Sequence, residues 1–558
     1  MGFVVERIWL KGYPPGVPAD IDPDCYTSLV DVFERSVQQF GPLTAYVCMG
    51  KTLTYAALDA ESRAFAAYLQ GVLGLKPGDR VALMMPNVLQ YPVCLFGVLR
   101  AGCVVVSCNP LCTGRELEYQ LKDSGATAIV ILENFAHVLQ EVLTRTPVKH
   151  IVTTQLGDML GPLKGRFVNL AVKRIKKLVP AWVLPGSRPF PEVRRLGASA
   201  AFSAPHVASG DLAFLQYTGG TTGVAKAAML SHRSLVANLL QGKAWITPFL
   251  GDGTQVVITA LPLYHVFALT ANCLVFMAIG ATNVLIPNPR DIPGLVKILG
   301  KTPFSVITGV NTLYNAMLNN PDFSTLDFSH LRISLGGGMA VQESVASRWK
   351  ALTGVTLVEA YGLTEASPAV AMNPLNLVEF NGMIGLPIPS TEVVIRDEHG
   401  HDVALGATGE LCVRGPQVMA GYWQRPDETQ RVMMADGFMR TGDIALMDER
   451  GFLRVVDRKK DMILVSGFNV YPNEVEAILS AHPAVVEVAA VGVPDERTGE
   501  AVKVFIVRRD AVFSAEAVIA HCRESLSAYK VPHQVEFRDE LPKSNVGKIL
   551  RRALRDAH

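Results

Sequence analysis

A Gly/Thr-rich run in the middle of the chain, flanked by a predicted strand and a predicted helix, constrains the fold more than any other stretch. Residues 211–217 are mostly apolar and predict a buried strand. In the run from Thr218 to Lys226, small residues let backbone N–H and hydroxyl groups approach an anion closely. Ser231 is a suitable N-cap for a helix over residues 231–240. The order of strand, phosphate loop and helix predicts a nucleotide site in an α/β fold.

This run differs from a Walker A motif. Three residues, not four, separate Gly219 from Gly223, and Lys226 is followed by Ala227 instead of Ser or Thr. An ordinary P-loop ATPase is therefore disfavoured. A surface turn rich in Gly and Thr is the alternative, and the rest of the chain has to decide between them.

Composition excludes several classes of protein. The chain has 558 residues, of which 49% are hydrophobic, so several domains with a large core are expected. The net charge of +1 argues against a nucleic-acid partner. The nine cysteines are scattered without a CxxC pair, which is typical of reduced thiols in a cytoplasmic protein. No signal-peptide pattern and no run of about 18 apolar residues is found, so cytoplasmic localisation is expected.

Apolar strands alternate with helical patterns along most of the chain. In the first part, strands are predicted at residues 79–85, 103–107 and 128–132, and helices at 58–69 and 91–101. Such alternation predicts parallel α/β layers. Three later segments, at residues 391–396, 409–414 and 451–456, favour a small β-barrel or sheet. Residues 1–459 are expected to form one large domain.

A charge cluster at residues 457–461 is suited either to a solvated turn or to a linker. Beyond it, the patterns predict a smaller α+β domain over residues 460–558. Its predicted elements are helices at 472–479 and 515–526 and strands at 485–493 and 501–507. The predicted fold class is therefore α/β: a large N-terminal domain of layered α/β subdomains plus a small β-barrel, followed by a smaller, mobile α+β C-terminal domain.

Residues 164–182 are basic and amphipathic, and no acidic residue interrupts them. On a helical wheel their apolar residues gather on one side. The basic residues are Lys164, Arg166, Lys173, Arg174, Lys176 and Lys177, and the apolar ones Val168, Ala171, Val172, Ile175, Leu178 and Val179. One interpretation is a helix that lies on a membrane surface, which would make the protein peripheral on the inner membrane. The other is an ordinary surface helix packed against the core.

Several later motifs each carry a weak signal. Three glycines, Gly336 to Gly338, follow a predicted strand and would let a flat ligand approach the backbone. Residues 357–365 place an aromatic ring, a hydroxyl and a carboxylate close together, and Glu365 could reach Mg²⁺. Asp443 follows a glycine in a turn and could bind ribose hydroxyls. By themselves His265 and Lys548 would be taken for a core histidine and a surface lysine.

Taken together, these stretches resemble the adenylate-forming superfamily in order and rough spacing over essentially the whole chain. The resemblance is nearest to bacterial long-chain fatty acid–CoA ligases, including their fatty-acyl signature at residues 436–460. It implies activation of a carboxylic acid by ATP and Mg²⁺ to an acyl-adenylate, then transfer to coenzyme A. The departures are Ala227, Ala228, Phe438 and Ala366, none of which removes a charged catalytic group.

The resemblance implies a role for each matching residue. Lys548, Glu365, Thr221 and His265 would be catalytic, with Thr221 and Glu365 organising Mg²⁺. Nucleotide phosphates and adenine would be bound by Tyr217, Thr218, Gly219, Gly220, Thr221, Thr222, Gly223, Lys226, Gly336, Gly337, Gly338, Glu359, Ala360, Tyr361, Gly362 and Thr364. Asp443 and Arg458 would bind ribose. Lys460 would mark a hinge, and Ser466, Gly467 and Lys530 would lie near the pantetheine of coenzyme A.

Other functions remain open on the sequence. A medium-chain or aryl (coumarate-type) acid–CoA ligase would share every motif and differ only in the acyl pocket. A ligase that loads a carrier protein, or a non-catalytic binding protein on the same fold, is a further alternative. The expected partners are small molecules and no nucleic acid, with membrane contact and a homodimer as additional expectations.

Overall fold

The computed structural model describes residues 6–218, 225–251, 253–466, 468–495, 497–509, 512–544 and 547–555. Most of the predicted phosphate loop lies outside these residues, as does one residue expected near the pantetheine. Six predicted site residues therefore lie outside the described ranges, and their roles stay predictions. They are Gly219, Gly220, Thr221, Thr222, Gly223 and Gly467.

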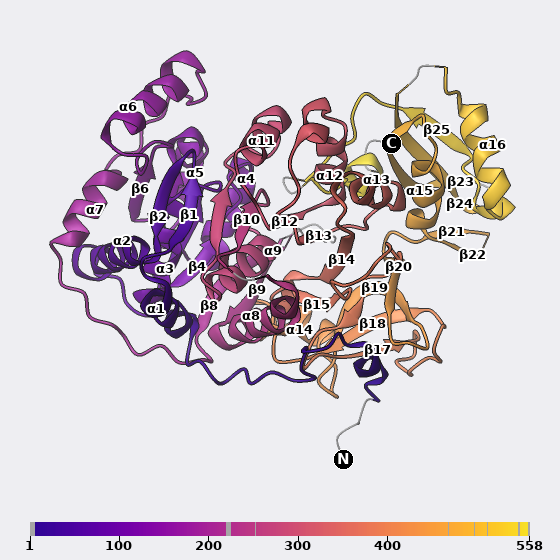
Figure 1. The fold of residues 1–558 in the computed structure, drawn as a ribbon, viewed down its shortest axis with the longest axis horizontal. Helices are drawn as coiled ribbons and strands as arrows, with labels where there is room; N and C mark the ends of the chain where they lie inside the picture. Colours follow the sequence, from indigo (N-terminus) through magenta and orange to yellow (C-terminus); the bar gives the residue numbers. More distant parts are fainter. Residues whose placement is uncertain are drawn as a thin grey trace.

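A seven-stranded sheet contains strands β3 to β9 (Figure 1). Its order is β7-β6-β5-β3-β4-β8-β9, and all neighbours are parallel except β8 and β9. Strands β3 to β5 are almost completely buried, which explains their continuous apolar sequences. The strands are β3 (Arg80–Met84), β4 (Val104–Ser107), β5 (Ala128–Leu132), β6 (His150–Thr154), β7 (Arg188–Pro189), β8 (Leu212–Thr218) and β9 (Lys226–Ser231).

A nine-stranded sheet follows, in the order β16-β15-β14-β13-β12-β10-β11-β1-β2. It is parallel from β14 to β1 and antiparallel at both edges. One hydrophobic core contains residues of both large sheets. The strands are β1 (Thr44–Cys48), β2 (Lys51–Thr54), β10 (Val256–Thr259), β11 (Thr282–Leu285), β12 (Val306–Gly309), β13 (Ile333–Gly336), β14 (Leu357–Gly362), β15 (Ala369–Met372) and β16 (Leu386–Pro387).

Helices pack on these sheets, and several begin at a side-chain cap. Ser28, Thr54, Thr113 and Ser231 each accept a hydrogen bond from a backbone N–H three residues later. The helices of this part are α1 (Leu29–Phe40), α2 (Tyr55–Ala67), α3 (Gln90–Arg100), α4 (Gly114–Ser124), α5 (Ala136–Val142), α6 (Pro162–Leu170), α7 (Phe190–Ala198), α8 (His232–Ile246), α9 (Val266–Ala268), α10 (Val275–Met277), α11 (Ile292–Leu299), α12 (Asn311–Leu318) and α13 (Glu343–Thr353).

The structure corrects the predicted order around the phosphate loop. Strand β9 lies between the loop and the helix, and it pairs antiparallel with β8. The helix predicted after Ser231 is α8, and the cap on Ser234 N is formed as expected, at 3.1 Å. The loop therefore joins two strands of a hairpin instead of leading directly into a helix N-terminus.

The remaining strands form two smaller sheets (Figure 1). In the first, β17 (Glu392–Arg396), β18 (Gly409–Arg414), β19 (Met439–Met447) and β20 (Leu453–Arg458) are antiparallel, with β17 and β20 at the edges. Of the two forms expected, barrel or sheet, the described strands adopt the open sheet. Helix α14 (Pro426–Val432) lies beside it.

The last part of the chain has its own hydrophobic clusters, drawn entirely from residues 463–554. Its predicted helices and strands are all found. They are β21 (Ile463–Val465), β22 (Phe468–Val470), α15 (Pro472–Ser480), β23 (Val485–Asp495), β24 (Gly499–Arg508), α16 (Ala515–Ser525), β25 (Gln534–Phe537) and α17 (Arg551–Arg555).

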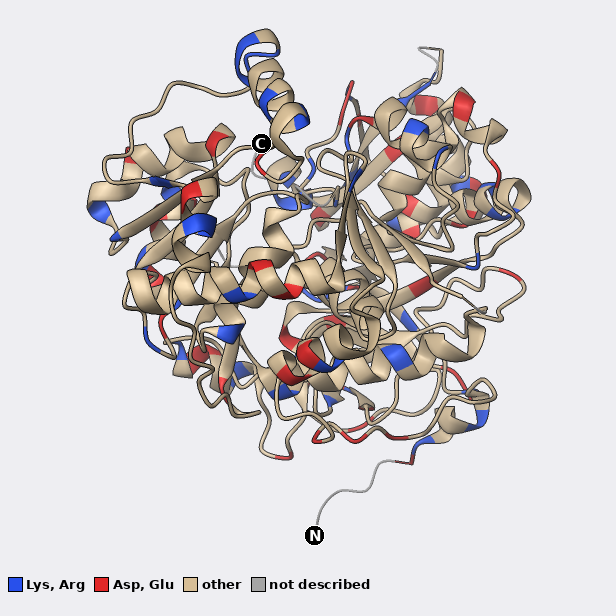
Figure 2. Cartoon of the chain, turned by 60° about the vertical axis from the view of Figure 1, so that its left-hand side comes forward, with Lys and Arg blue, Asp and Glu red and all other residues tan. Residues whose placement is uncertain are grey.

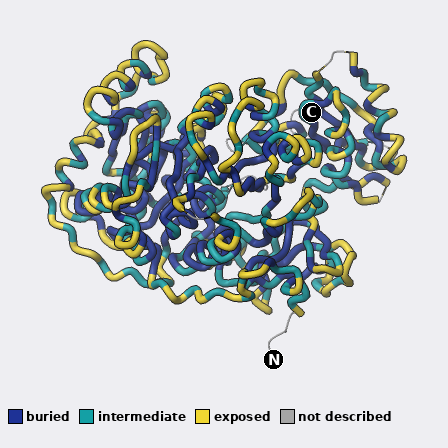
Figure 3. The backbone as a smooth tube through the Cα atoms, in the orientation of Figure 1, coloured by how far each residue is buried: buried dark blue, intermediate teal, exposed yellow. Residues whose placement is uncertain are grey.

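The basic segment packs differently from its helical-wheel prediction. Helix α6 continues into a π-helical turn, Ala171–Ile175, and the structure has no helix beyond Lys176 up to residue 182. Val168 and Val172 are buried as expected, whereas Ile175 and Leu178 are exposed. Figure 3 shows α6 at the margin of the molecule, largely exposed. Among the described residues, no helix is long and apolar enough to cross a membrane.

Candidate active site

A cavity of about 2140 Å³ lies where the large sheets, the open sheet and the last part of the chain meet. It extends along β12 and β13, whose first residues Val306 and Ile333 line it, and past the carboxyl ends of β12, β13 and β14, where parallel α/β sheets bind ligands. Predicted site residues from distant parts of the sequence line it together. They are Tyr217, Thr218, Lys226, His265, Gly337, Gly338, Glu359, Ala360, Tyr361, Gly362, Thr364, Glu365, Asp443, Arg458, Lys460 and Lys548.

The glycine run after β13 is required by close packing. A Cβ on Gly336 would lie 2.5 Å from Val341 Cγ2, and one on Gly337 would lie 3.1 Å from the carbonyl oxygen of Ala360. Gly338 has a φ of +77°, which favours glycine. Gly336 itself lies behind the cavity wall, while the next two glycines form part of that wall. The run therefore leaves a flat slot beside β14.

Contacts with three neighbouring residues fix the position of Asp443, the predicted ribose ligand. The Tyr361 hydroxyl donates to Asp443 Oδ2 at 2.5 Å, and Arg458 Nε lies 3.2 Å from Asp443 Oδ1. Strands β19 and β20 place Asp443 directly opposite Arg458 in their register. Thr441 Oγ1 also accepts a hydrogen bond from Asp443 N at 3.1 Å. The carboxylate thus has a fixed position with a cation next to it.

Two residues that sequence reasoning missed connect the predicted magnesium ligand to the phosphate-loop lysine. The Tyr422 hydroxyl donates to Glu365 Oε1 at 2.7 Å, and Lys226 Nζ lies 5.3 Å from the centre of the Tyr422 ring. Lys226 is also paired with Glu428 of α14. Tyr422 and Glu428 lie about 200 residues beyond Lys226, so sequence spacing does not relate them to it. A Gly-Tyr-Trp run at residues 421–423 is the signal that could have found the tyrosine.

The donor chemistry of this corner fits a hard cation. Glu365 offers a carboxylate, and Mg²⁺ in nucleotide sites is held by one or two carboxylates together with substrate phosphates. Within the described ranges, no cluster of three or more His, Cys, Asp or Glu residues could bind a metal without a substrate. Glu365 would therefore bind the cation together with ATP.

Burial changes the protonation of three groups in the cavity. It lowers the pKa of His265 to about 4, with nearby Lys548 adding to the effect, so this imidazole is neutral at pH 7. Burial raises the pKa of Glu359 to about 8, so its carboxyl is mostly protonated at that pH. Burial, together with the charge on Arg458, lowers the pKa of Lys548 to about 8, while Asp443 opposes the shift.

The loop that carries Lys548 contacts the large domain. Thr312 Oγ1 donates to the carbonyl oxygen of Gly547 at 3.0 Å. Gly547 has a φ of +82°, and a Cβ there would lie 2.8 Å from the same hydroxyl, so glycine is needed. Ser544 Oγ accepts from Lys548 N at 3.1 Å. These contacts place a lysine from the end of the chain beside Asp443 and His265.

Apolar residues of α8 and of the helical segment after His265 line one part of the cavity, which we call the apolar arm and which the sequence did not reveal. It is lined by Gly242 and Ile246 of α8 and by Ala271, Val275 and Phe276. A Cβ on Gly242 would lie 3.0 Å from Val275 Cγ2, so this glycine keeps the arm open. An arm of this kind suits an aliphatic chain whose carboxylate stays near Lys548.

Comparison with known proteins agrees with this geometry. The family model described as AMP-binding enzyme matches residues 33–423, and the model described as AMP-binding enzyme C-terminal domain matches residues 474–548. The chain belongs to the AMP-binding enzyme family.

Relatives of known name within this family cover nearly the whole chain. A long-chain-fatty-acid–CoA ligase from Yersinia pestis is 59% identical over 552 residues, which is 99% of this chain and 98% of that protein. A feruloyl-CoA synthase from Amycolatopsis is 35% identical over 91% of this chain and 94% of its own length. The crystal structure of the anthranilate CoA ligase AuaEII with anthranoyl-AMP is 25% identical, with a TM-score of 0.85 over 96% of this chain and 99% of that one.

Two residues expected near the pantetheine of coenzyme A lie outside the cavity in this member of the AMP-binding enzyme family. Lys530 is paired with Glu474 at 2.7 Å, and Ser466 has a φ of +50° at the end of β21. Neither lines the cavity that Lys548 enters.

Ala227 and Ala228 lie in the extended strand β9, where glycine is not required.

Proposed function

We propose that this chain activates long-chain fatty acids with ATP and transfers them to coenzyme A. The 59% identity to a long-chain-fatty-acid–CoA ligase over 99% of the chain carries the proposal. The apolar arm next to His265 and Lys548 supports it, because a long aliphatic chain needs a deep apolar channel. The lower identity to the feruloyl-CoA synthase gives the aryl alternative less support.

In the first step, a carboxylate oxygen of the fatty acid attacks the α-phosphorus of ATP, and the bond to pyrophosphate breaks. Both reactants are negative, so the residues have to neutralise charge and align the groups. The Lys548 ammonium would bind the carboxylate and the α-phosphate. Asp443 would hold the ribose, and Tyr361 would lie against the adenine. Bound Mg²⁺, held through Glu365, would supply further positive charge on the phosphates.

In the second step, the thiolate of coenzyme A attacks the acyl carbonyl, and the C–O bond to AMP breaks. His265 would border this carbon, and with its pKa lowered to about 4 it would be neutral and would not act as an acid at pH 7. The family resemblance implies that Ser466, Gly467 and Lys530 lie near the pantetheine. In this structure Ser466 and Lys530 lie outside the cavity that Lys548 enters. We therefore propose that residues 460–558 rotate about Lys460 between the two steps, with residues 1–459 as the stationary domain.

The test is AMP release with coenzyme A, Mg²⁺ and a panel of acids from C4 to C18 together with aryl acids. The proposal expects turnover to be greatest with long-chain acids and to be lost when EDTA removes Mg²⁺. Greater turnover with C4–C8 or aryl acids would exclude the long-chain assignment. AMP release that coenzyme A does not accelerate would exclude thioester formation as the second step.

We further propose that α6 and the residues after it bind the surface of an anionic membrane, which would be the source of the substrate. Leu163, Phe167 and Ile175 are 84%, 67% and 71% exposed, far more than a packed helix requires. Lysines and arginines follow directly, and Figure 2 shows this projecting helix with blue segments and no red ones. Apolar groups with adjacent cations are the pattern of interfacial helices.

Vesicle co-sedimentation tests this surface. Vesicles with 30% anionic phospholipid should bind the protein, and replacing Leu163 and Phe167 by Ser, or Arg174, Lys176 and Lys177 by Gln, should reduce binding at least fivefold. Exchange of Lys149 and Arg195 for Gln, outside residues 162–182, serves as a charge-loss control. Equal binding of all variants would refute the proposal. The expected homodimer stays a prediction.

A further inference from the structure

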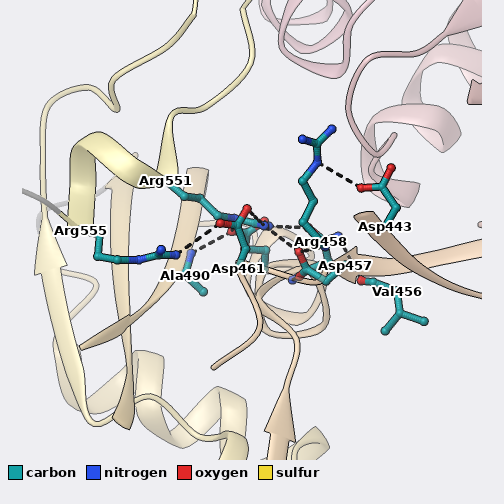
Figure 4. Close-up of polar contacts among 10 residues, drawn as sticks. Asp443, Val456, Asp457, Arg458, Asp461, Ala490, Arg551 and Arg555 are labelled. Carbon is teal, nitrogen blue, oxygen red and sulfur yellow. Dashed lines mark hydrogen bonds and ion pairs between the residues drawn. The ribbon is translucent and has the colours of Figure 1, made fainter. Parts of the chain in front are cut away.

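Asp457 lies in β20, close before the proposed hinge at Lys460, and its side chain is completely buried. Its Oδ1 accepts from Arg551 Nη1 at 3.0 Å, and its Oδ2 accepts from the backbone N–H of Asn473 at 2.7 Å. Both partners come after the hinge in sequence. Figure 4 shows Arg551 directed from α17 toward Asp457 and Asp461.

The contact with Asn473 is a helix cap supplied from the other side of the hinge. Asn473 is in the first turn of α15, and the side chain of the N-cap residue, Tyr471, forms no capping hydrogen bond. A carboxylate at this place satisfies a free N–H and favours the positive end of the helix dipole. Asn473 Nδ2 also donates to the carbonyl oxygen of Val456 at 3.1 Å. Helix α15 is therefore attached to β20 at its N-terminus.

Arg551 is held firmly on the other side of this contact. Its Nε and Nη2 donate to Glu476 at 2.9 and 2.7 Å, and Glu476 also accepts from the backbone N–H of Ala490 at 2.8 Å. Glu476 and Ala490 belong to the same small domain as Arg551. Arg551 lies three residues after Lys548, so the fixed position of its guanidinium restricts where the loop carrying Lys548 can lie.

We propose that Asp457 is a positioning residue that holds the small domain in the orientation where Lys548 enters the active site. This inference rests on the proposed rotation about Lys460. Asp457 precedes the hinge and would stay with the large domain, whereas Asn473 and Arg551 would move away together. The pair between Arg551 and Glu476 would survive the rotation, but both contacts of Asp457 would break. Asp457 thus favours adenylate formation and has to be released before thioester formation.

The test compares the two half-reactions in Asp457→Asn, which keeps the shape and an acceptor oxygen but removes the charge. Single-turnover formation of acyl-adenylate from ATP and palmitate should be at least tenfold slower. Thioester formation from supplied palmitoyl-adenylate and coenzyme A should be unchanged or faster. Arg555→Gln is the matched control, because Arg555 pairs with Asp461 at 3.4 Å inside the small domain. Both of its half-reaction rates should stay within twofold of wild type.

A second variant and a second measurement keep the inference testable if Asp457→Asn folds poorly. Asn473→Ala removes the hydrogen bond to Val456 and also the one that Asn473 Oδ1 accepts from Arg551 Nη2. It should slow adenylate formation selectively by a smaller factor, because Asp457 still accepts from the backbone N–H of residue 473 and from Arg551. Trypsin should also cut after Lys459 or Lys460 faster in both variants than in Arg555→Gln. Equal loss of both half-reactions, or no change in either, would overturn the role of Asp457. Absence of acyl-adenylate formation in the wild-type protein would instead overturn the proposed function.

Discussion

Raising the pH above 8 should lower kcat/KM for acyl-adenylate formation, because Lys548 of the free enzyme then loses its charge. The pKa of Lys548 falls from 10.5 to about 8, first through burial and then through the charge of Arg458, while Asp443 opposes the shift. At 1.36 kcal/mol per pKa unit, the cavity disfavours the ammonium by at most about 3 kcal/mol, since residual solvent contact screens part of it. Lys548 is therefore charged in about nine in ten molecules at pH 7 and in about one in ten at pH 9.

The sign of the effect follows from which form is active. The ammonium binds the carboxylate and phosphate, and a lowered pKa means that this form is lost as the pH rises through about 8. The assay is pyrophosphate release without coenzyme A between pH 6 and 10. kcat/KM for ATP reports the free enzyme and should fall about tenfold per pH unit above 8. kcat reports the complex and should fall only at higher pH, because bound phosphates stabilise the cation.

Lys548→Arg is the matched variant, because its guanidinium stays charged across the whole range. Its kcat/KM is expected to be lower at pH 7 but without the decrease above pH 8. A wild-type kcat/KM that stays flat to pH 10 would refute the argument. The same decrease in the arginine variant would assign the ionisation to another group.

Three further changes test other parts of the site. Lys548→Ala should lower the rate of adenylate formation at least 1000-fold, because its charge serves that step. Thioester formation from supplied acyl-adenylate should stay within about fivefold of wild type. Equal losses in both steps would be inconsistent with this role. Gly242→Leu should fill the apolar arm at Val275 and shift the preferred acid by several carbons toward shorter chains, as measured with an acid panel; an unchanged preference would place the chain elsewhere. Tyr422→Phe removes the hydrogen bond to Glu365 and should raise the Mg²⁺ concentration for half-maximal activity about fivefold, near 1 kcal/mol; an unchanged Mg²⁺ requirement would separate this tyrosine from the cation site.

The sequence by itself determined the elements and the family. The apolar run at residues 128–132 predicted a buried strand, which the structure has, and Ser231 marks the start of α8 because a cap depends on residues three apart. The motifs around Glu365, Asp443 and Lys548 were sufficient for the resemblance, since each is a short local pattern. The boundary near residue 460 was also suggested locally, by a run of charges.

Contacts between distant residues were decided only by the tertiary structure. Strand β9 was missed because its pairing with β8, rather than its own short sequence, makes it a strand. The partners of Lys226 and Glu365 were missed because Tyr422 and Glu428 lie far along the chain from both. The charge cluster at residues 457–461 contains a fully buried carboxylate, Asp457. The burial and the interaction partners of a charged side chain determine its role. Both are supplied by segments that are far apart in the sequence, so no local pattern predicts them.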